Sequence, residues 1–465
     1  MDLSFFRDRD FFRAMLAIAL PVAFQQLISA SLNMVDVLMV GQLGENSIAA
    51  VGLANQVFFL LFLFLFGVTS GMAIFTAQYW GKGDTENIRR VLGISLAVTL
   101  GVGAIFSFVA LLFPQQVLRF YTPDPRVIEL GAGYLRIVGL SYPLVAIVTA
   151  YMSVLRSITL VKLTALIAGT SLALKTGLGY LLIFGIGRLP ALGVRGAALG
   201  TAIAWTFELA LLLFLVYRLK TPLAANPLSF FRFDGHFLRR VLVTSMPAAL
   251  NEMAWSFGIT VYNAVYAHIG TNAIAAININ TTIEDLFFVT FIGLGNACSV
   301  MVGNRIGAGQ KELSFEYGRR FTILGVLAAL VLGVIVISLR EPVIGLYDIS
   351  PQAADNVRRL MLIFGLTGWL RVHNFVVFIG ALRAGGDTRY AMFTELFSIW
   401  LIGVPLALLG GFVLRLPVYW VYTLVLVEEL VKAVIIDLRF ISRKWIHDLV
   451  NLAALDGESQ IVGEA

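Results

Sequence analysis

Twelve long stretches of mainly apolar residues run through this chain, and a helix needs only about 20 such residues to span a bilayer. Lipid offers no partners to backbone polar groups, so stretches of this length are typical of membrane-spanning helices. Of the 465 residues, 59% are hydrophobic and 13% are charged, whereas a soluble domain has roughly 25% charged residues. The sequence therefore predicts an all-α integral membrane protein with twelve transmembrane helices.

An internal repeat organises these helices into two halves. A shift of 226 residues aligns Pro21 with Pro247, and a shift of 227 aligns Arg156 with Arg383. Six spans return a chain to the side it entered from, so the halves are parallel repeats related by a pseudo-two-fold axis along the membrane normal. We predict four regions: an N-terminal six-helix lobe (1–220), a cytoplasmic linker (221–236), a C-terminal six-helix lobe (237–445) and a cytoplasmic tail (446–465).

The basic residues predict the orientation and argue against nucleic acid as a partner. Most Lys and Arg outside the spans fall in segments that are cytoplasmic if the N-terminus is cytoplasmic. We expect a multi-pass protein of the inner (plasma) membrane with both termini in the cytoplasm. Its net charge of +6 then reflects membrane topology, and the expected partners are the lipid bilayer and small-molecule substrates, with the chain acting as a monomer.

The sequence holds no pattern typical of an enzyme. It lacks Walker and His-Glu-x-x-His motifs. The single cysteine, Cys298, can form neither an internal disulfide nor a cysteine metal cluster. We therefore expect a transporter without cofactor or metal, driven by an H⁺ or Na⁺ gradient worth ~2.3 kcal/mol per charge per 100 mV.

The first span, near residues 11–40, carries one carboxylate, Asp36. A charge at the bilayer centre costs roughly 2.5–3.5 kcal/mol, so such residues are candidates for function. Helical periodicity places Gln25, Ser29 and Asn33 on the same stripe, which we expect to face a substrate cavity. Pro21 removes one intrahelical hydrogen bond and is a candidate gating hinge. The alternative is that Asp36 only holds the bundle together.

The seventh span contains an acid framed by aromatic residues. In "MPAALNEMAWSFGITVYNAVYAHIG" (246–270), Glu252 is a candidate coupling acid, and Trp255, Asn263 and Tyr266 are candidate cavity residues. An acid beside aromatic rings can hold an organic cation through charge and cation–π attraction. The two aromatic residues could equally serve packing or lie at the membrane interface.

Three further spans carry charge. The eighth holds the candidate ion-coupling acids Glu284 and Asp285, which point about 100° apart, so we expect only one of them to face the cavity. The tenth holds Arg371 and His373, and the histidine could relay protons or simply pack. On the fifth, Lys175 is a candidate ion-coupling residue, expected to pair with an acid such as Asp36 or Glu208 or to be neutral with a depressed pKa. The alternative is that it extends toward an interface. Glu428 and Lys432 on the last span are expected to neutralise each other at i,i+4.

Several stretches resemble the multidrug and toxic compound extrusion (MATE) family of the multidrug/oligosaccharidyl-lipid/polysaccharide exporter superfamily. They are "ALPVAFQQLISASLNMVDVLMVGQLG" (19–44), "GKGD" (81–84), "GAGQ" (307–310) and "ALRAGGDTR" (381–389). The resemblance implies two V-shaped lobes and the export of organic, usually cationic, compounds in exchange for H⁺ or Na⁺. It implies that Asp36 and Glu252 match the family's coupling acids of the first and seventh helices.

The chain departs from the family at two places. Lys175 and Gly179 stand where one branch has an Asn and an Asp, and Arg371 to His373 stand where the NorM-like branch has a further acid. The expected function is a secondary active antiporter for multidrug efflux, or xenobiotic transport, by alternating access. The alternative is a flippase for lipid-linked or anionic amphipathic compounds, favoured by basic residues within the spans: Arg136, Lys175, Arg371 and His373.

Overall fold

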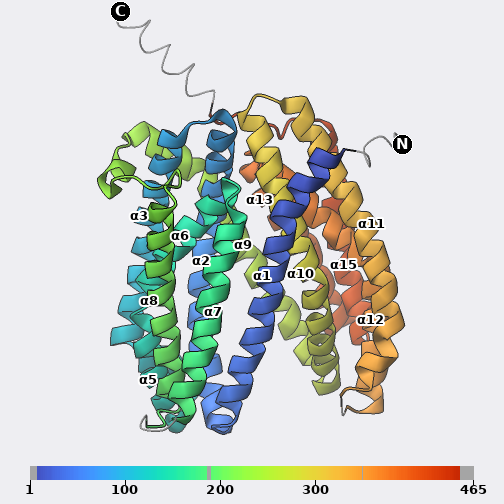
Figure 1. Ribbon diagram of the computed structural model, residues 1–465. Coiled ribbons are helices and arrows are strands. Elements are labelled where there is room, and N and C mark those ends of the chain that lie inside the picture. Colours follow the sequence, from blue (N-terminus) through green and yellow to red (C-terminus); the bar gives the residue numbers. More distant parts are fainter. Residues whose placement is uncertain (1–7, 186–189, 348, 451–465) are drawn as a thin grey trace, which may run out of the picture. The chain divides into compact units, whose positions relative to one another are not determined.

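The computed structural model describes residues 8–185, 190–347 and 349–450, and the elements in these ranges are helices without any strand (Figure 1). Contacts within the chain define two compact units. We call residues 24–245 the N-terminal unit, and residues 1–23 with 246–465 the C-terminal unit. Two helices, α1 (Arg9–Gly41) and α9 (Gly235–Ile269), run from one unit into the other.

The remaining helices each lie within one unit. Those of the N-terminal unit are α2 (Glu45–Lys82), α3 (Thr85–Leu112), α4 (Pro114–Arg119), α5 (Pro125–Gly139), α6 (Tyr142–Ser157), α7 (Val161–Phe184), α8 (Val194–Arg218) and the short 3-10 helix η2 (Pro227–Phe231). Those of the C-terminal unit are α10 (Thr271–Gly307), α11 (Lys311–Ile344), α12 (Pro351–Phe375), η3 (Val376–Arg383), α13 (Thr388–Leu396), η4 (Phe397–Gly403), α14 (Val404–Leu408), η5 (Leu409–Val413) and α15 (Val418–Ile441). The three η elements of this second group are π-helical.

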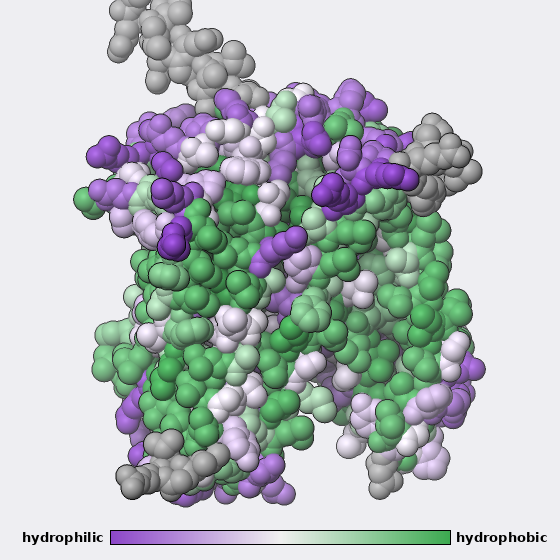
Figure 2. Space-filling view, viewed as in Figure 1, coloured by the Kyte–Doolittle hydropathy of each residue, from purple (hydrophilic) through white to green (hydrophobic). Residues whose placement is uncertain are grey.

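The predicted twelve-helix membrane fold is confirmed in the described part of the chain. Nine helical stretches there are long and apolar enough to cross a membrane, and α5 with α6, bent by 50°, makes a tenth. Helices α9 and α15 are long enough as well but carry more polar and charged residues. Figure 2 shows apolar side chains over the middle of the helices and hydrophilic ones near their ends. This distribution is the one a bilayer requires.

The beginnings of α1 and α9 pack away from their own sequence halves. Phe11 contacts Phe321 of α11 with ring centroids 5.2 Å apart. Gly293 of α10 lies so close to α1 that a Cβ there would be 2.5 Å from the Ala19 carbonyl oxygen. In the N-terminal unit, a Cβ on Gly71 of α2 would be 2.7 Å from Ser245 of α9. Because the 226-residue shift aligns Ala19 with Ser245, the two exchanges follow the internal repeat.

Three of the family-like motifs form turns between helices. Gly83, Gly309 and Gly386 have positive φ angles of 79°, 76° and 86°, a conformation that glycine adopts without strain. After Gly83, the Asp84 side chain accepts a hydrogen bond from the Asn87 N–H at 3.0 Å and caps α3. These motifs therefore end one helix and start the next.

The predicted linker packs on the N-terminal unit. Phe230 of η2 is buried and lies against α3, and the Arg89 Nε donates to the Pro222 carbonyl at 2.8 Å. The predicted lobes and linker follow the order of the chain, whereas the units follow contacts, so the two partitions differ at the starts of α1 and α9. The predicted tail, 446–465, lies outside the described residues beyond position 450.

Candidate functional site

The N-terminal unit contains an ion pair within its helices. Asp36 of α1 and Lys175 of α7 face each other, with Lys175 Nζ 2.6 Å from Asp36 Oδ2. The Thr176 hydroxyl donates to the other carboxylate oxygen at 3.5 Å. About a quarter of each charged side chain is exposed, 27% for Lys175 and 21% for Asp36. Pairing lowers the cost of both charges in a low-dielectric setting.

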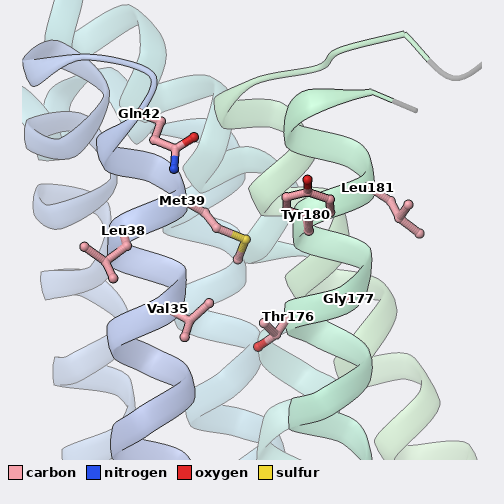
Figure 3. Close-up of a pocket in the computed structure, with 8 residues that line it drawn as sticks. All are labelled: Val35, Leu38, Met39, Gln42, Thr176, Gly177, Tyr180 and Leu181. Atoms are coloured by element: carbon pink, nitrogen blue, oxygen red, sulfur yellow. The ribbon is translucent and has the colours of Figure 1, made fainter. Parts of the chain in front are cut away.

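A wide-open apolar cavity of about 680 Å³ lies between α1 and α7, where Val35 and Thr176 are the sequence neighbours of the two charged residues (Figure 3). Its lining residues are Val35, Leu38, Met39, Gln42, Thr176, Gly177, Tyr180 and Leu181. Its apolar lining is open to the surface, since Leu38 and Tyr180 are 58% and 52% exposed. The predicted cavity residues of α1 do not line it: Gln25 and Ser29 are half-buried and Asn33 is exposed. Pro21 lies inside a continuous α1, and its role as a hinge stays a prediction.

In the C-terminal unit, Glu284 gathers three partners from three helices. Arg371 Nη1 of α12 donates to Glu284 at 2.6 Å, and the Tyr422 hydroxyl of α15 donates at 2.5 Å. The Asn280 amide, one turn earlier on α10, donates at 2.5 Å. The neighbouring Asp285 is exposed. Of the two adjacent acids, Glu284 is therefore the one that contacts polar residues of other helices.

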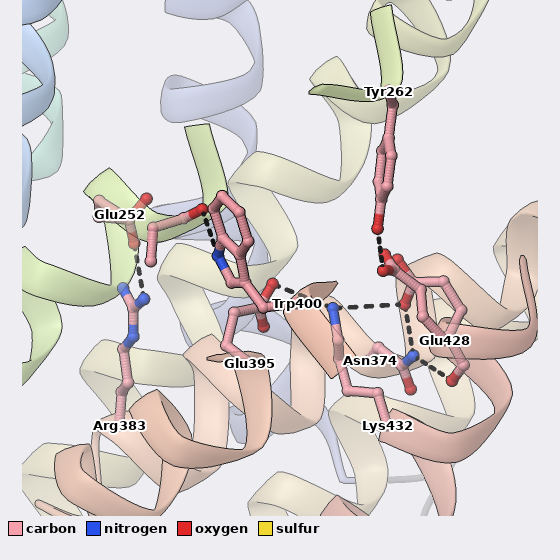
Figure 4. A network of polar contacts seen from close by, with 10 residues as sticks. Glu252, Tyr262, Asn374, Arg383, Glu395, Trp400, Glu428 and Lys432 are labelled. Carbon is pink, nitrogen blue, oxygen red and sulfur yellow. Dashed lines mark hydrogen bonds and ion pairs between the residues drawn. The ribbon is translucent and has the colours of Figure 1, made fainter. Parts of the chain in front are cut away.

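Further polar contacts in this unit involve Glu252 and Lys432 (Figure 4). Arg383 Nη2 of η3 donates to Glu252 of α9 at 2.6 Å. Lys432 Nζ of α15 donates to Glu395 of α13 at 3.0 Å and lies 3.8 Å from Glu429. The expected pairing of Lys432 with Glu428 is wrong, because Lys432 instead faces these two acids.

Glu428 has a different partner. The Tyr262 hydroxyl of α9 donates a short hydrogen bond to Glu428, and both side chains are buried (Figure 4). Asn374 of α12 donates to the neighbouring Glu429 at 2.6 Å. Contacts among the described residues thus connect five acids to partners on facing helices, and we call these contacts the described network: Glu252, Glu284, Glu395, Glu428 and Glu429.

The other predicted residues of this unit are dispersed. Tyr266 is buried, whereas Trp255 and Asn263 are exposed. The His373 Nε2 lies 3.2 Å from Asp437 Oδ1. The contacts place His373 beside Asp437 and away from the acid that Arg371 holds.

Sequence reasoning missed Glu395, Glu429, Tyr422 and the partner role of Arg383. Each is a polar residue in an otherwise apolar segment, such as Glu395 in "FTELFSIW" (393–400). That signal was available for each residue. Which helix faces each of these residues could not be predicted, because helical periodicity describes one helix at a time.

Long apolar helices with ion pairs and polar networks inside them define a multi-pass membrane protein with a function inside its helices. A model of the MatE family matches residues 21–181 and 247–409, so it matches each sequence half once and begins both times at one of the two aligned prolines. The chain belongs to the MATE family of transporters.

Two relatives match this chain over most of the length of both proteins. The probable multidrug resistance protein NorM of Rhizobium meliloti is 30% identical over 84% of this chain and 85% of that protein. The uncharacterized transporter YisQ of Bacillus subtilis is 26% identical over 88% of this chain and 90% of that protein.

Solved structures of the superfamily share the fold. A multidrug resistance MATE family transporter in an outward-facing conformation gives a TM-score of 0.81 at 19% identity, covering 93% of this chain and 96% of that one. A superfamily transporter from Pyrococcus furiosus, described as having a binding pocket of reverse polarity, gives 0.83 at 18% identity, covering 92% and 95%.

Proposed function

We propose that this protein is a secondary active antiporter of the plasma membrane that exports amphipathic organic compounds, mainly cations, in exchange for H⁺ or Na⁺. Relatives of similar length carry the name multidrug resistance protein, which supports efflux of foreign compounds. The ion coupling is argued from the charges inside the helices.

The observation that carries the proposal is an excess of acid in the C-terminal unit. The described network holds five carboxylates, those of Glu252, Glu284, Glu395, Glu428 and Glu429. It holds three cations, those of Arg371, Arg383 and Lys432. Unpaired negative charge is expensive inside a membrane, so binding of H⁺ or Na⁺ stabilises the network. Release of that ion on the other side would provide the coupling.

The apolar cavity between α1 and α7 supports an amphipathic substrate. Its wall offers apolar area for the body of such a molecule, with Gln42, Thr176 and the Tyr180 hydroxyl near it as polar groups. An organic cation would meet Asp36 next to the cavity, through exchange with Lys175. This arrangement supports a substrate that carries both apolar surface and positive charge.

The alternative of an anion flippase is less well supported by the geometry. It depends on free positive charge within the helices. Lys175 and Arg371, two of the residues that favoured it, each hold an acid at 2.6 Å, and His373 faces Asp437. Positive charge that is already neutralised attracts an anion weakly.

Proteoliposomes containing the purified protein test the proposal. An H⁺ gradient and a Na⁺ gradient would be imposed separately, and accumulation of a fluorescent cationic dye would be followed. We expect one of the two gradients to drive accumulation, and the matching ionophore to abolish it. Dye movement that ignores both gradients, or transport of an anionic amphipath in preference to the dye, would refute the proposal.

A further inference from the structure

The contact between Tyr262 and Glu428 involves the residue that the internal repeat aligns with Asp36. The 226-residue shift aligns Asp36 with Tyr262, and the 227-residue shift aligns Thr201 with Glu428. In the first half, the acid stands on the first helix and the hydroxyl residue on the sixth. In the second half the two are exchanged: the hydroxyl residue stands on the first helix, α9, and the acid on the last, α15.

The two acids differ in what neutralises them. Asp36 has a lysine ammonium at 2.6 Å. Glu428 has no ion-pair partner within 4.0 Å among the residues that the structure describes, and its one close polar contact is the Tyr262 hydroxyl. Only 4% of Glu428 and 4% of Tyr262 are exposed. A carboxylate buried without a cation is stabilised by taking up a proton.

Gly403 of η4 provides the room for this contact. A Cβ at position 403 would overlap both the Tyr262 hydroxyl oxygen and Glu428 Oε2. The 227-residue shift aligns Gly403 with Thr176, whose hydroxyl contacts Asp36 in the first half. The close approach of Gly403 and the burial of Glu428 leave the carboxyl group little contact with water, which favours binding of a proton over binding of a hydrated cation.

We propose that Glu428 is the carboxyl group that binds and releases the coupling proton, and that Tyr262 positions it. This inference rests on the proposed exchange function. In the step, a proton from water on one side binds a carboxylate oxygen of Glu428, and the same O–H bond breaks when the proton leaves to the other side. Asp36 is held by Lys175 at 2.6 Å, so the step is assigned to Glu428 alone.

The charged and titratable groups around Glu428 favour this assignment. Those that act on Glu428 directly are Tyr262 and Tyr266 on α9, Glu395 on α13, and Glu429 and Lys432 on α15. Glu284 on α10 and Arg371 on α12 lie beyond them, where they interact with Tyr266. The positive charges are held by other acids: Lys432 by Glu395 at 3.0 Å, and Arg371 by Glu284 at 2.6 Å. Neither of these two cations forms an ion pair with Glu428.

The first test is Glu428→Gln, with Glu312→Gln as the matched control, because Glu312 is 81% exposed and pairs with Arg443 at the surface. The fluorescent cationic dye is added to the purified protein in weakly buffered detergent solution, and the release of protons is followed with a separate pH indicator. We expect release by the wild type and the control and at least a tenfold loss in Glu428→Gln. In proteoliposomes, the variant should lose accumulation driven by the pH gradient but keep exchange of labelled for unlabelled dye.

Tyr262→Phe keeps the inference testable if Glu428→Gln fails to fold. The hydroxyl stabilises the ionised carboxylate, so its removal should move the midpoint of the pH–transport profile upward by about one unit. A purely structural tyrosine would change the rate without moving the midpoint. Unchanged proton release in Glu428→Gln, or an unmoved midpoint in Tyr262→Phe, would overturn the assignment. If the wild type itself shows no gradient-driven transport, the proposed function fails instead.

Discussion

Replacing Lys175 by Met tests how much the ion pair between Asp36 and Lys175 stabilises the protein. The charged atoms are 2.6 Å apart, and at an effective dielectric constant of ~20 such charges attract by about 6 kcal/mol. Desolvation of the two ions offsets most of this attraction. Because 27% and 21% of the side chains stay exposed, we expect a net interaction of about 2 kcal/mol.

A double-mutant cycle isolates this interaction. Lys175→Met leaves an unpaired carboxylate and should lower the free energy of unfolding by about 2–3 kcal/mol. Asp36→Asn leaves an unpaired ammonium and should also destabilise. The double variant should lose less than the sum of the two single losses, with a coupling of about 2 kcal/mol.

The free energies would be measured by titrating purified variants in mixed micelles with SDS. Arg126 and Glu129 provide the control cycle, because they pair at 3.0 Å but are 62% and 71% exposed, which predicts a coupling of no more than ~1 kcal/mol. If the Asp36–Lys175 cycle is additive within ~0.5 kcal/mol, the ion pair does not stabilise the helix contact and the reasoning fails.

Two further predictions concern packing and a turn. Gly93→Ala should lower the free energy of unfolding by about 1–3 kcal/mol, because its Cβ would overlap the backbone of η2. The control Gly101→Ala, in the same helix, has open space around the added Cβ and should be neutral or stabilising. Equal effects of the two variants in the same SDS titration would contradict this prediction. Burial raises the pKa of Asp387, but hydrogen bonds from His447 and Arg439 outweigh it and hold the pKa below 3.8. Asp387→Asn should therefore lose about 2 kcal/mol at neutral pH, and the loss should shrink only as the pH falls below about 4; a difference that instead changes between pH 5 and 8 would assign the effect to another group.

The architecture was predictable because it depends on features that one stretch of sequence contains. Long apolar runs indicate spans wherever they fall, and a glycine such as Gly83 followed by Asp84 indicates a helix end and a helix start. The correspondence of the two halves was predictable as well, because prolines and glycines can be aligned without knowing which residues are in contact.

The partners within the site were less predictable, because they depend on which helices face each other. Glu428 and Lys432 share a helix face, which suggested mutual neutralisation, but α13 brings Glu395 to the lysine and α9 brings Tyr262 to the glutamate. The 100° step between Glu284 and Asp285 predicted that one would point inward, and the position of Arg371 shows that it is Glu284. Periodicity names the candidates on a face, whereas tertiary packing selects the partner.

The exchanged beginnings of α1 and α9 make each sequence half depend on the other for its own packing. A polypeptide of the first half alone would lack the segment of α9 that lies on Gly71, and one of the second half alone would lack the segment of α1 that lies on Gly293. Neither sequence half therefore contains all of the helix contacts that it makes in the full chain.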